Sequence, residues 1–189
     1  MHLNALSYYA DFFIAAGLIV LFADLATLEP TWLAMTIWVS GACFGVMALT
    51  PVEYVVHRWV YHRVGYFREV HNAHYAEPNA YIGAPPILGV ALILGLVFLP
   101  LASTNSNLAG GVTAGFLFGY MGYMLVHHAA HYWTLTPSSW LHACRRHHAL
   151  HHHHSEDCNF GIITSLWDIV FQTSHDRRRR RRKLGKSLM

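Results

Sequence analysis

Charged residues are scarce in this chain of 189 residues: Asp, Glu, Lys and Arg make up 12% of it, whereas hydrophobic residues make up 54%. This composition excludes an ordinary soluble domain. Four stretches are apolar and close to the roughly 20 residues that a transmembrane helix needs, which predicts an integral membrane protein. They run from Tyr8 to Leu28, from Thr31 to Leu49, from Ile87 to Ser103 and from Gly110 to Val126.

Cysteine is also scarce. The three cysteines, Cys43, Cys144 and Cys158, form an odd number and show no CxxC spacing. They therefore indicate neither a disulfide framework nor a thiolate metal site, and we interpret them as small buried apolar residues. The start of the chain lacks a cationic segment followed by a small-residue cleavage site, so the first apolar stretch is predicted to remain as a membrane anchor.

Lys and Arg are absent from the four apolar stretches and from the short connections within each pair of them. Four crossings place both termini and the segment from Thr50 to Pro86 on one side of the membrane. All 13 Lys and Arg then lie on that side: Arg58, Arg63 and Arg68 in the central segment and the other ten after Cys144. The positive-inside rule predicts that this side is cytoplasmic.

Seven consecutive cations, from Arg177 to Lys183, follow the last apolar and His-rich part of the chain. Closely spaced like charges repel and bury no core, so residues 177–189 are predicted to be a disordered basic tail after a single domain at residues 1–176. Such a run is attracted to anionic lipid by about 1 kcal/mol per cation near the membrane surface. No aromatic residues alternate with the cations, and nucleic-acid binding is therefore not expected.

Histidine, in contrast, is abundant, with 16 residues. Most of them lie in four short motifs: HRWVYH from His57, HNAH from His71, HHAAH from His127 and HHALHH from His147. Imidazole-rich sites suit Fe, Zn, Cu or Ni, whereas Mg and Ca prefer oxygen ligands. The motifs therefore predict a site for transition-metal ions next to the membrane, on its cytoplasmic side.

The spacing of the histidines suggests how they share the metal ions. Residues three or four apart lie on one face of a helix, whereas His57 and His62 are five apart and diverge by about 140°. This divergence favours two metals over one. Three sets of histidines are each predicted to point toward one site: His71 with His74, His127 with His131, and His148 with His151 and His152.

A helix boundary is predicted at Thr50, which can cap a helix that begins with Pro51 and has Glu53 in a capping box. The new helix would contain His57 and His62 and rise about 18 Å beyond the membrane-spanning stretch. The predicted fold is all-α: an integral membrane four-helix bundle, made of two transmembrane hairpins, with a His-rich helical cap on the cytosolic side.

Acidic residues lie near the histidine motifs, where a carboxylate can accept the distal N–H of a ligand imidazole and fix its orientation. This supporting role is predicted for Glu53, Glu69, Glu77, Glu156, Asp157 and Asp168. Polar or supporting roles are also predicted for the extra histidines His128, His147, His153 and His154, and no role is assigned to His2 and His175.

The motifs HX4H, HXXH, HX3H and HXXHH, in this order around paired apolar helices, resemble those of the fatty acid hydroxylase superfamily. The resemblance extends from about Glu53 to Thr173 and includes EYVVHR at Glu53, GAPP at Gly83, NFG at Asn159 and WD at Trp167. It implies two irons, which zinc can replace in purified samples. It also implies nine ligands: His57, His62, His71, His74, His127, His131, His148, His151 and His152.

One position departs from the pattern of that family. The second motif usually ends in HXXHH, and Tyr75 occupies its last position here. Tyr75, Glu77, a water molecule or an extra histidine such as His147 or His153 is then expected in place of the missing imidazole. An incomplete site would leave an inactive scaffold. A smaller departure is Gln172, where a glycine is common.

The resemblance implies an O2-dependent non-haem diiron enzyme that hydroxylates a C–H bond of a membrane lipid, with a fatty acyl chain as the leading candidate. Carotenoid and sterol hydroxylases or desaturases share this chemistry. The sequence shows no P-loop, no GxGxxG and no haem or ferredoxin signature, so electrons are expected from a separate donor of the ferredoxin or cytochrome b5 type. A His-rich metal transporter or sensor is the alternative from another class, although the apolar stretches have no central histidine.

Overall fold

The computed structural model describes residues 2–28 and 30–176, and the predicted basic tail, residues 177–189, lies outside them. Within the described residues the regular secondary structure is helical, with no strand. An isolated β-bridge joins His2 to Ile82. The prediction of an all-helical protein is confirmed for this part of the chain.

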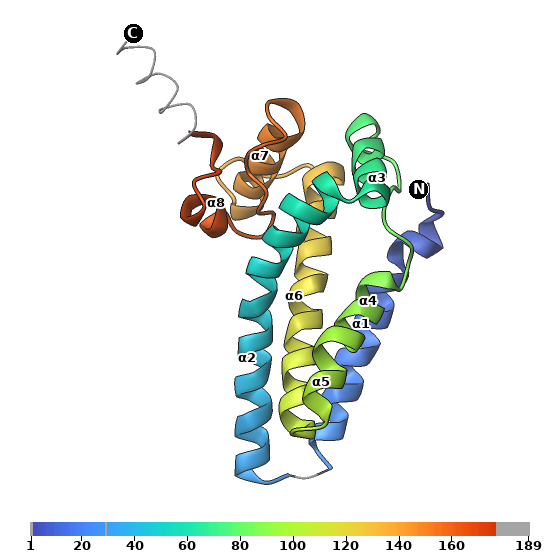
Figure 1. Ribbon diagram of the computed structural model, residues 1–189, viewed down its shortest axis with the longest axis vertical. Helices are drawn as coiled ribbons and strands as arrows, with labels where there is room; N and C mark the ends of the chain where they lie inside the picture. Colours follow the sequence, from blue (N-terminus) through green and yellow to red (C-terminus); the bar gives the residue numbers. More distant parts are fainter. Residues whose placement is uncertain (1, 29, 177–189) are drawn as a thin grey trace.

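Three long helices form the body of the molecule (Figure 1). Each of them is long and apolar enough to cross a membrane. A fourth apolar helix, Leu88–Ala102, is shorter, and the number of four crossings therefore remains a prediction. The long helices are α1 (Ala5–Ala26), α2 (Trp32–Val55) with its π-helical continuation η1 (Val56–Tyr61), and α6 (Ser106–Tyr132); the shorter one consists of α4 (Leu88–Ile93), η2 (Leu94–Phe98) and α5 (Leu99–Ala102).

Helix α6 contacts each of the other apolar helices. Its first half is almost wholly buried, and glycines on α2 and α6 allow the two backbones to approach closely. A Cβ atom at Gly115 would overlap the backbone of Ala42, and one at Gly45 would overlap the backbone of Val112. Small residues therefore set the spacing of α2 and α6, and with it the position of the histidines at the ends of both helices.

The helix boundary predicted at Thr50 is wrong, because α2 continues through Pro51 without a break. Pro51 lacks the N–H group that would bond the carbonyl of Met47. Thr50 Oγ1 donates a hydrogen bond to that carbonyl instead, at 2.9 Å. The hydrogen bond that proline removes is thus replaced within the same turn, and the helix continues into η1.

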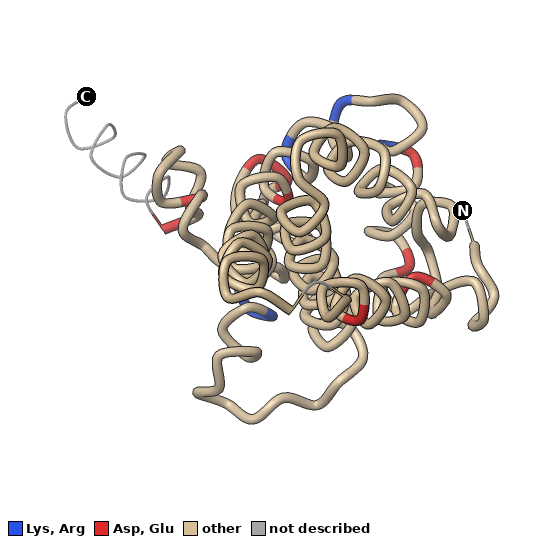
Figure 2. Tube along the Cα trace, turned by 90° about the horizontal axis from the view of Figure 1, so that it is seen from below, with Lys and Arg blue, Asp and Glu red and all other residues tan. Residues whose placement is uncertain are grey.

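A cap of shorter helices covers one end of the body: α3 (Gly65–Ala76), α7 (Trp140–His153) and α8 (Leu166–Val170) (Figure 1). Ser139 caps the start of α7, and its hydroxyl accepts from the N–H of His142 at 3.1 Å. Figure 2, seen from below, shows few charged positions along the chain. Lys and Arg of the described residues lie in the cap or in η1 and the turn after it: Arg58, Arg63, Arg68, Arg145 and Arg146.

Candidate metal centre

The ends of η1 and α6, together with α3 and α7, bring the nine predicted ligand histidines into two adjacent groups that could each hold a metal ion. Within each group, the ligand nitrogens lie within 4.8 Å of one another. The four-histidine group consists of His57, His62, His71 and His151. The five-histidine group consists of His74, His127, His131, His148 and His152.

His57 and His62 belong to the same group, so the predicted divergence of their side chains is wrong. The residues between them form the π-helix η1, in which hydrogen bonds run from residue i to i+5. A spacing of five residues is then close to one full turn. The two imidazole rings lie 5.5 Å apart, centroid to centroid.

Two pairs predicted to share a site are divided between the groups instead. His71 and His74 of α3 have ring centroids 6.3 Å apart, and His148 and His151 of α7 have the same separation. Helices α3 and α7 each run past both groups, so histidines from neighbouring positions of one helix belong to different groups. The third prediction agrees with the structure, because His127 and His131 of α6 belong to one group, with ring centroids 4.8 Å apart.

Backbone carbonyls fix the orientation of two rings in the four-histidine group. His57 Nδ1 lies 2.5 Å from the carbonyl oxygen of Phe160, and His151 Nδ1 lies 2.6 Å from that of Cys158. A carbonyl only accepts, so each Nδ1 bears the proton and each Nε2 presents a lone pair to the group. These two partners could not be predicted from the sequence, since every residue has a carbonyl and no motif marks the ones that are used.

The five-histidine group contains buried ring nitrogens without a hydrogen-bond partner among the described residues. They are both nitrogens of His74, both of His152 and Nδ1 of His148. A buried polar atom that lacks a partner costs about 1–3 kcal/mol. A metal ion would supply the missing partner, and a donor set made only of imidazole suits a transition metal. The residues present therefore fit a bound metal.

The nine grouped histidines are neutral at physiological pH, because the pKa of each is lowered. Burial, and then the charges of neighbouring histidines, lower the pKa of His71 and of His152 to about 2. Burial lowers the pKa of His74 to about 4, and burial is also the main cause of a pKa of about 4 at His151. Neutral imidazole is the form that binds a metal, so these side chains need not lose protons first.

Asp168 supports the four-histidine group through the backbone rather than through a ligand ring. Its fully buried carboxylate accepts from the N–H groups of Phe160 and Gly161, both at 2.9 Å, and from Thr173 Oγ1 at 2.7 Å. Burial raises its pKa, but hydrogen bonds from His147, Thr173 and Gly161 outweigh that effect and lower it. Asp168 thus holds the loop whose Phe160 carbonyl orients His57.

Glu53 has a similar place on the other side of this loop. Its buried carboxylate accepts from the backbone N–H groups of Ile162, at 2.5 Å, and Ile163, at 3.2 Å. It is neither part of a capping box nor bonded to a ligand histidine. The predicted supporting role is therefore indirect, as it is for Asp168.

The remaining predicted residues lie at different distances from the two groups. The Tyr75 hydroxyl oxygen lies 3.0 Å from His71 Nε2 and 2.5 Å from His151 Nε2, and burial raises its pKa above the usual value. Exposed Glu77 lies 3.7 Å from His2. Two histidines outside both groups bond other residues: His128 bonds Tyr8, and His147 bonds Asp168. The other predicted supporting residues are exposed and also lie outside both groups: Glu69, Glu156, Asp157, His153 and His154.

An apolar cavity of about 570 Å³ reaches the two groups from the side of the long helices. Its wall is formed by α1, α2, α4, α6 and their extensions, and includes Val56, Val60 and Phe116. His57 of one group and His127 of the other line the same space. Histidines of both groups therefore border a largely hydrophobic cavity.

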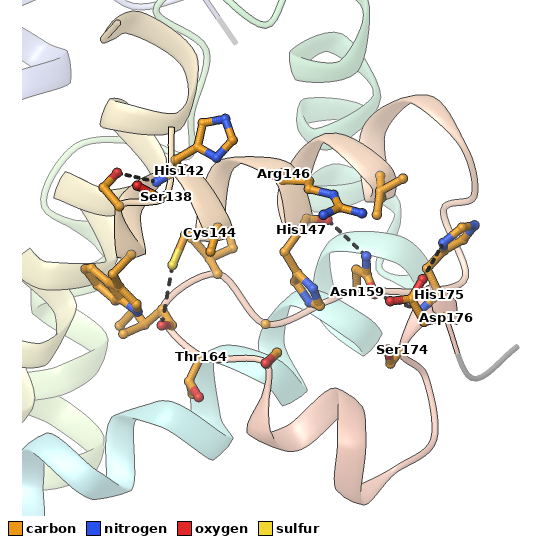
Figure 3. Close-up of a pocket in the computed structure, with 18 residues that line it drawn as sticks. Ser138, His142, Cys144, Arg146, His147, Asn159, Thr164, Ser174, His175 and Asp176 are labelled. Atoms are coloured by element: carbon orange, nitrogen blue, oxygen red, sulfur yellow. Dashed lines mark hydrogen bonds and ion pairs between the residues drawn. The ribbon is translucent and has the colours of Figure 1, made fainter. Parts of the chain in front are cut away.

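A second cavity, of about 640 Å³, lies between α7 and the loop that follows it (Figure 3). Its lining is more polar and includes His142, Arg146 and Asn159. Asn159 Nδ2 donates to the carbonyl of His147 at 3.1 Å. None of the nine grouped histidines lines this space, so it is separate from the metal centre.

The model of the fatty acid hydroxylase family matches residues 42–173 of this chain. The chain is 28% identical to the fatty acid 2-hydroxylase of Homo sapiens over 179 residues, which cover 88% of this chain and 47% of that protein. It is 27% identical to a dihydroceramide fatty acyl 2-hydroxylase, FAH2, of Arabidopsis thaliana over 183 residues, which cover 80% of this chain and 76% of that protein. The chain thus spans about half the length of its mammalian relatives.

The fold is also similar to that of a solved structure, full-length scs7p, of which only the hydroxylase domain is visible. The TM-score is 0.73, and the match covers 90% of this chain and 70% of the other, with 24% sequence identity. At this level of identity the similarity concerns the fold alone.

Proposed function

This chain belongs to the fatty acid hydroxylase family, and we propose that it is an O2-dependent non-haem diiron hydroxylase of a membrane lipid. The observation that supports this proposal most is the pair of adjacent histidine groups at the end of one apolar cavity. We infer that the four-histidine group and the five-histidine group each bind one iron. Zinc binds such sites more tightly than Fe(II) and can replace it in purified samples.

When bound, the two irons would supply the reductive activation of O2 that oxidises an unactivated C–H bond. The overall reaction takes one C–H bond, one O2, two electrons and two protons to one C–OH group and one water. The protein's own part is to present neutral imidazoles and to exclude water from the reacting end of the cavity. Apolar residues of the cavity wall, such as Val56, Val60 and Phe116, exclude the water.

A fatty acyl chain is the proposed substrate. The cavity is largely apolar and is lined by side chains from helices that are long and apolar enough to cross a membrane, and burial there stabilises an alkyl chain by about 0.8 kcal/mol per CH2. The relatives are named as hydroxylases of fatty acids and of dihydroceramide fatty acyl groups at carbon 2. These names favour an acyl substrate, oxidised next to its carbonyl, over a carotenoid or a sterol.

The proposed topology has four crossings in two hairpins, with the cap and both termini in the cytoplasm. The positions of Lys and Arg at the cap end support this orientation. A separate electron-transfer protein, of the ferredoxin or cytochrome b5 type, would then reach the metal centre from the cytosol.

The test is turnover of the purified, iron-loaded full chain in lipid nanodiscs that contain a long-chain acyl lipid and a reduced ferredoxin under 18O2. We expect two irons per chain and a hydroxylated product with one 18O atom. Two bound irons without product would contradict the proposed reaction. Metal movement across sealed vesicles would instead favour a transporter, and sub-stoichiometric metal without product would favour an inactive scaffold.

A further inference from the structure

The two histidine groups differ in size, and the difference coincides with Tyr75. Tyr75 lies four residues after His71 on α3, so both side chains are on one face of the helix. That face is directed at the four-histidine group. His74, one residue earlier, belongs to the five-histidine group. The tyrosine therefore stands beside the group that has one imidazole fewer.

The hydroxyl oxygen of Tyr75 has the spacing of a ligand atom. It lies 3.0 Å from His71 Nε2 and 2.5 Å from His151 Nε2. The nitrogens of the group are themselves 3.2 Å apart, both from His57 to His71 and from His62 to His151. Two donors bound at right angles to one ion, with bonds of about 2.0–2.1 Å, are about 2.9 Å apart. The oxygen thus belongs to the same cluster of donor atoms.

Ring packing holds the Tyr75 side chain in this position. Its ring centroid lies 4.4 Å from that of His71 and 4.4 Å from that of His152. The other substitutes for a missing imidazole lie elsewhere: Glu77 is exposed and paired with His2, and His147 is bonded to Asp168. The Tyr75 hydroxyl oxygen, in contrast, lies beside the Nε2 atoms of His71 and His151.

We propose that the Tyr75 oxygen is the fifth ligand of the metal held by His57, His62, His71 and His151, bound as phenolate. On binding, the metal replaces the phenolic proton, which leaves to the buffer. No electron is transferred in this step. His151 Nε2 can accept from the hydroxyl only while it is free, since its lone pair is the one that a metal takes. The proposal rests on the proposed metal centre but not on its reaction.

The anionic oxygen makes the two sites unequal. A phenolate is a harder and more negative donor than imidazole, so it stabilises a ferric ion over a ferrous ion at the four-histidine group. The five-histidine group, with neutral donors alone, has the opposite preference. An iron held with the Tyr75 oxygen would therefore have a lower reduction potential than an iron in the five-histidine group.

The test uses the full chain in detergent, loaded with Fe(III) or, in a parallel sample, with Cu(II), without substrate. A phenolate bound to either ion gives a visible charge-transfer absorption, and resonance Raman excitation in that band shows tyrosine ring vibrations. We expect both signals in the wild type. Tyr75→Phe should abolish them and weaken metal binding at this group by at least about tenfold. Tyr75→His should restore metal binding without the signals.

The matched control is Tyr61→Phe. The Tyr61 ring stacks on His71 with centroids 5.6 Å apart, but its hydroxyl, unlike that of Tyr75, is not hydrogen-bonded to a grouped histidine in the described residues, so both signals should persist. Two bound metals without a charge-transfer band, or a band that survives Tyr75→Phe, would overturn the proposal for Tyr75 alone. The band without hydroxylated lipid would leave the Tyr75 proposal standing and contradict the proposed reaction. A chain that binds neither ion would contradict both.

Discussion

At the scale of single residues, the metal centre depends on imidazole nitrogens that are buried and neutral. His57 and His151 have their protons held on Nδ1 by backbone carbonyls, and His74 has both nitrogens buried without a partner. The unpartnered nitrogens of His74 are unfavourable in the metal-free fold. A bound ion would remove that cost.

Replacing His148 by Ala should reduce the metal content from two ions toward one per chain. His148 is buried and its Nε2 lies 3.0 Å from His131 Nε2 in the five-histidine group. Product formation should fall by more than about a hundredfold. Metal analysis and product chromatography would measure both effects. His153→Ala, an exposed change on the same helix, is the control, and an equal loss in that variant would refute a specific role for His148.

The lowered pKa values of the cap histidines predict how stability changes with pH in the metal-free protein. The folded values, about 2 for His71 and about 4 for His74, lie below the ordinary value of 6.5, so the unfolded chain binds more protons below pH 6.5. Stability is then complete above about pH 6.5 and decreases as the pH falls toward 4. Thermal unfolding in detergent should show this decrease, and a constant midpoint between pH 7 and pH 5 would contradict it.

Residue type and spacing were sufficient to predict all nine grouped histidines, because a metal site of imidazoles needs many of them within a short distance. The distribution between two groups could not be predicted. Whether His71 and His74 meet one ion or two depends on how α3 lies relative to α7, and the sequence of one helix contains no information on that. The hydroxyl of Tyr75 was one of several open alternatives, and only its position among the nitrogens distinguishes it.

At the scale of helices, the π-helix η1 decides where His57 and His62 point. A regular α-helix would turn the two side chains apart, whereas the wider turn brings both to one group. Such a segment is set by its tertiary contacts rather than by its composition. For this reason the sequence predicted a helix there but gave the wrong direction for one of its side chains.

The loop between α7 and α8 is the second element that shapes the centre. Asp168→Asn should weaken metal binding at the four-histidine group by about 10–100-fold, because the loop with the Phe160 carbonyl loses its charged acceptor. Titration of the metal-free protein with Fe(II) would measure the loss. Asp176→Asn, an exposed change, should leave the affinity unaltered. An Asp168→Asn variant with wild-type affinity would show that the carboxylate does not position the ligands.

Close packing of α2 and α6 gives a test that does not involve metal. Gly115→Ala should destabilise the protein by about 1–3 kcal/mol, since the added methyl group overlaps the backbone of Ala42. Gly122→Ala on the same helix meets no atom within 4 Å and should be neutral or slightly stabilising. Thermal unfolding of both variants in detergent would compare them. Equal midpoints would indicate that the two helices pack less closely than described.

At the scale of the whole molecule, apolar helices support a histidine cap, and one cavity joins the two parts. The sequence predicted the apolar stretches well, because length and hydropathy are local properties. It predicted less well how far they extend: α2 and η1 together run well beyond the stretch that ended at Leu49, while Leu88–Ala102 is short for a crossing. The cavity requires side chains from α1, α2, α4 and α6 at once, and only the assembled fold shows it.

The central claim is that two metal ions lie side by side, each within one histidine group. Anomalous diffraction at the iron edge, or at the zinc edge for zinc-containing samples, from crystals of the full chain tests it most directly. We predict two anomalous peaks, one among His57, His62, His71 and His151 and the other among His74, His127, His131, His148 and His152. A single peak, or peaks away from these imidazoles, would contradict the account.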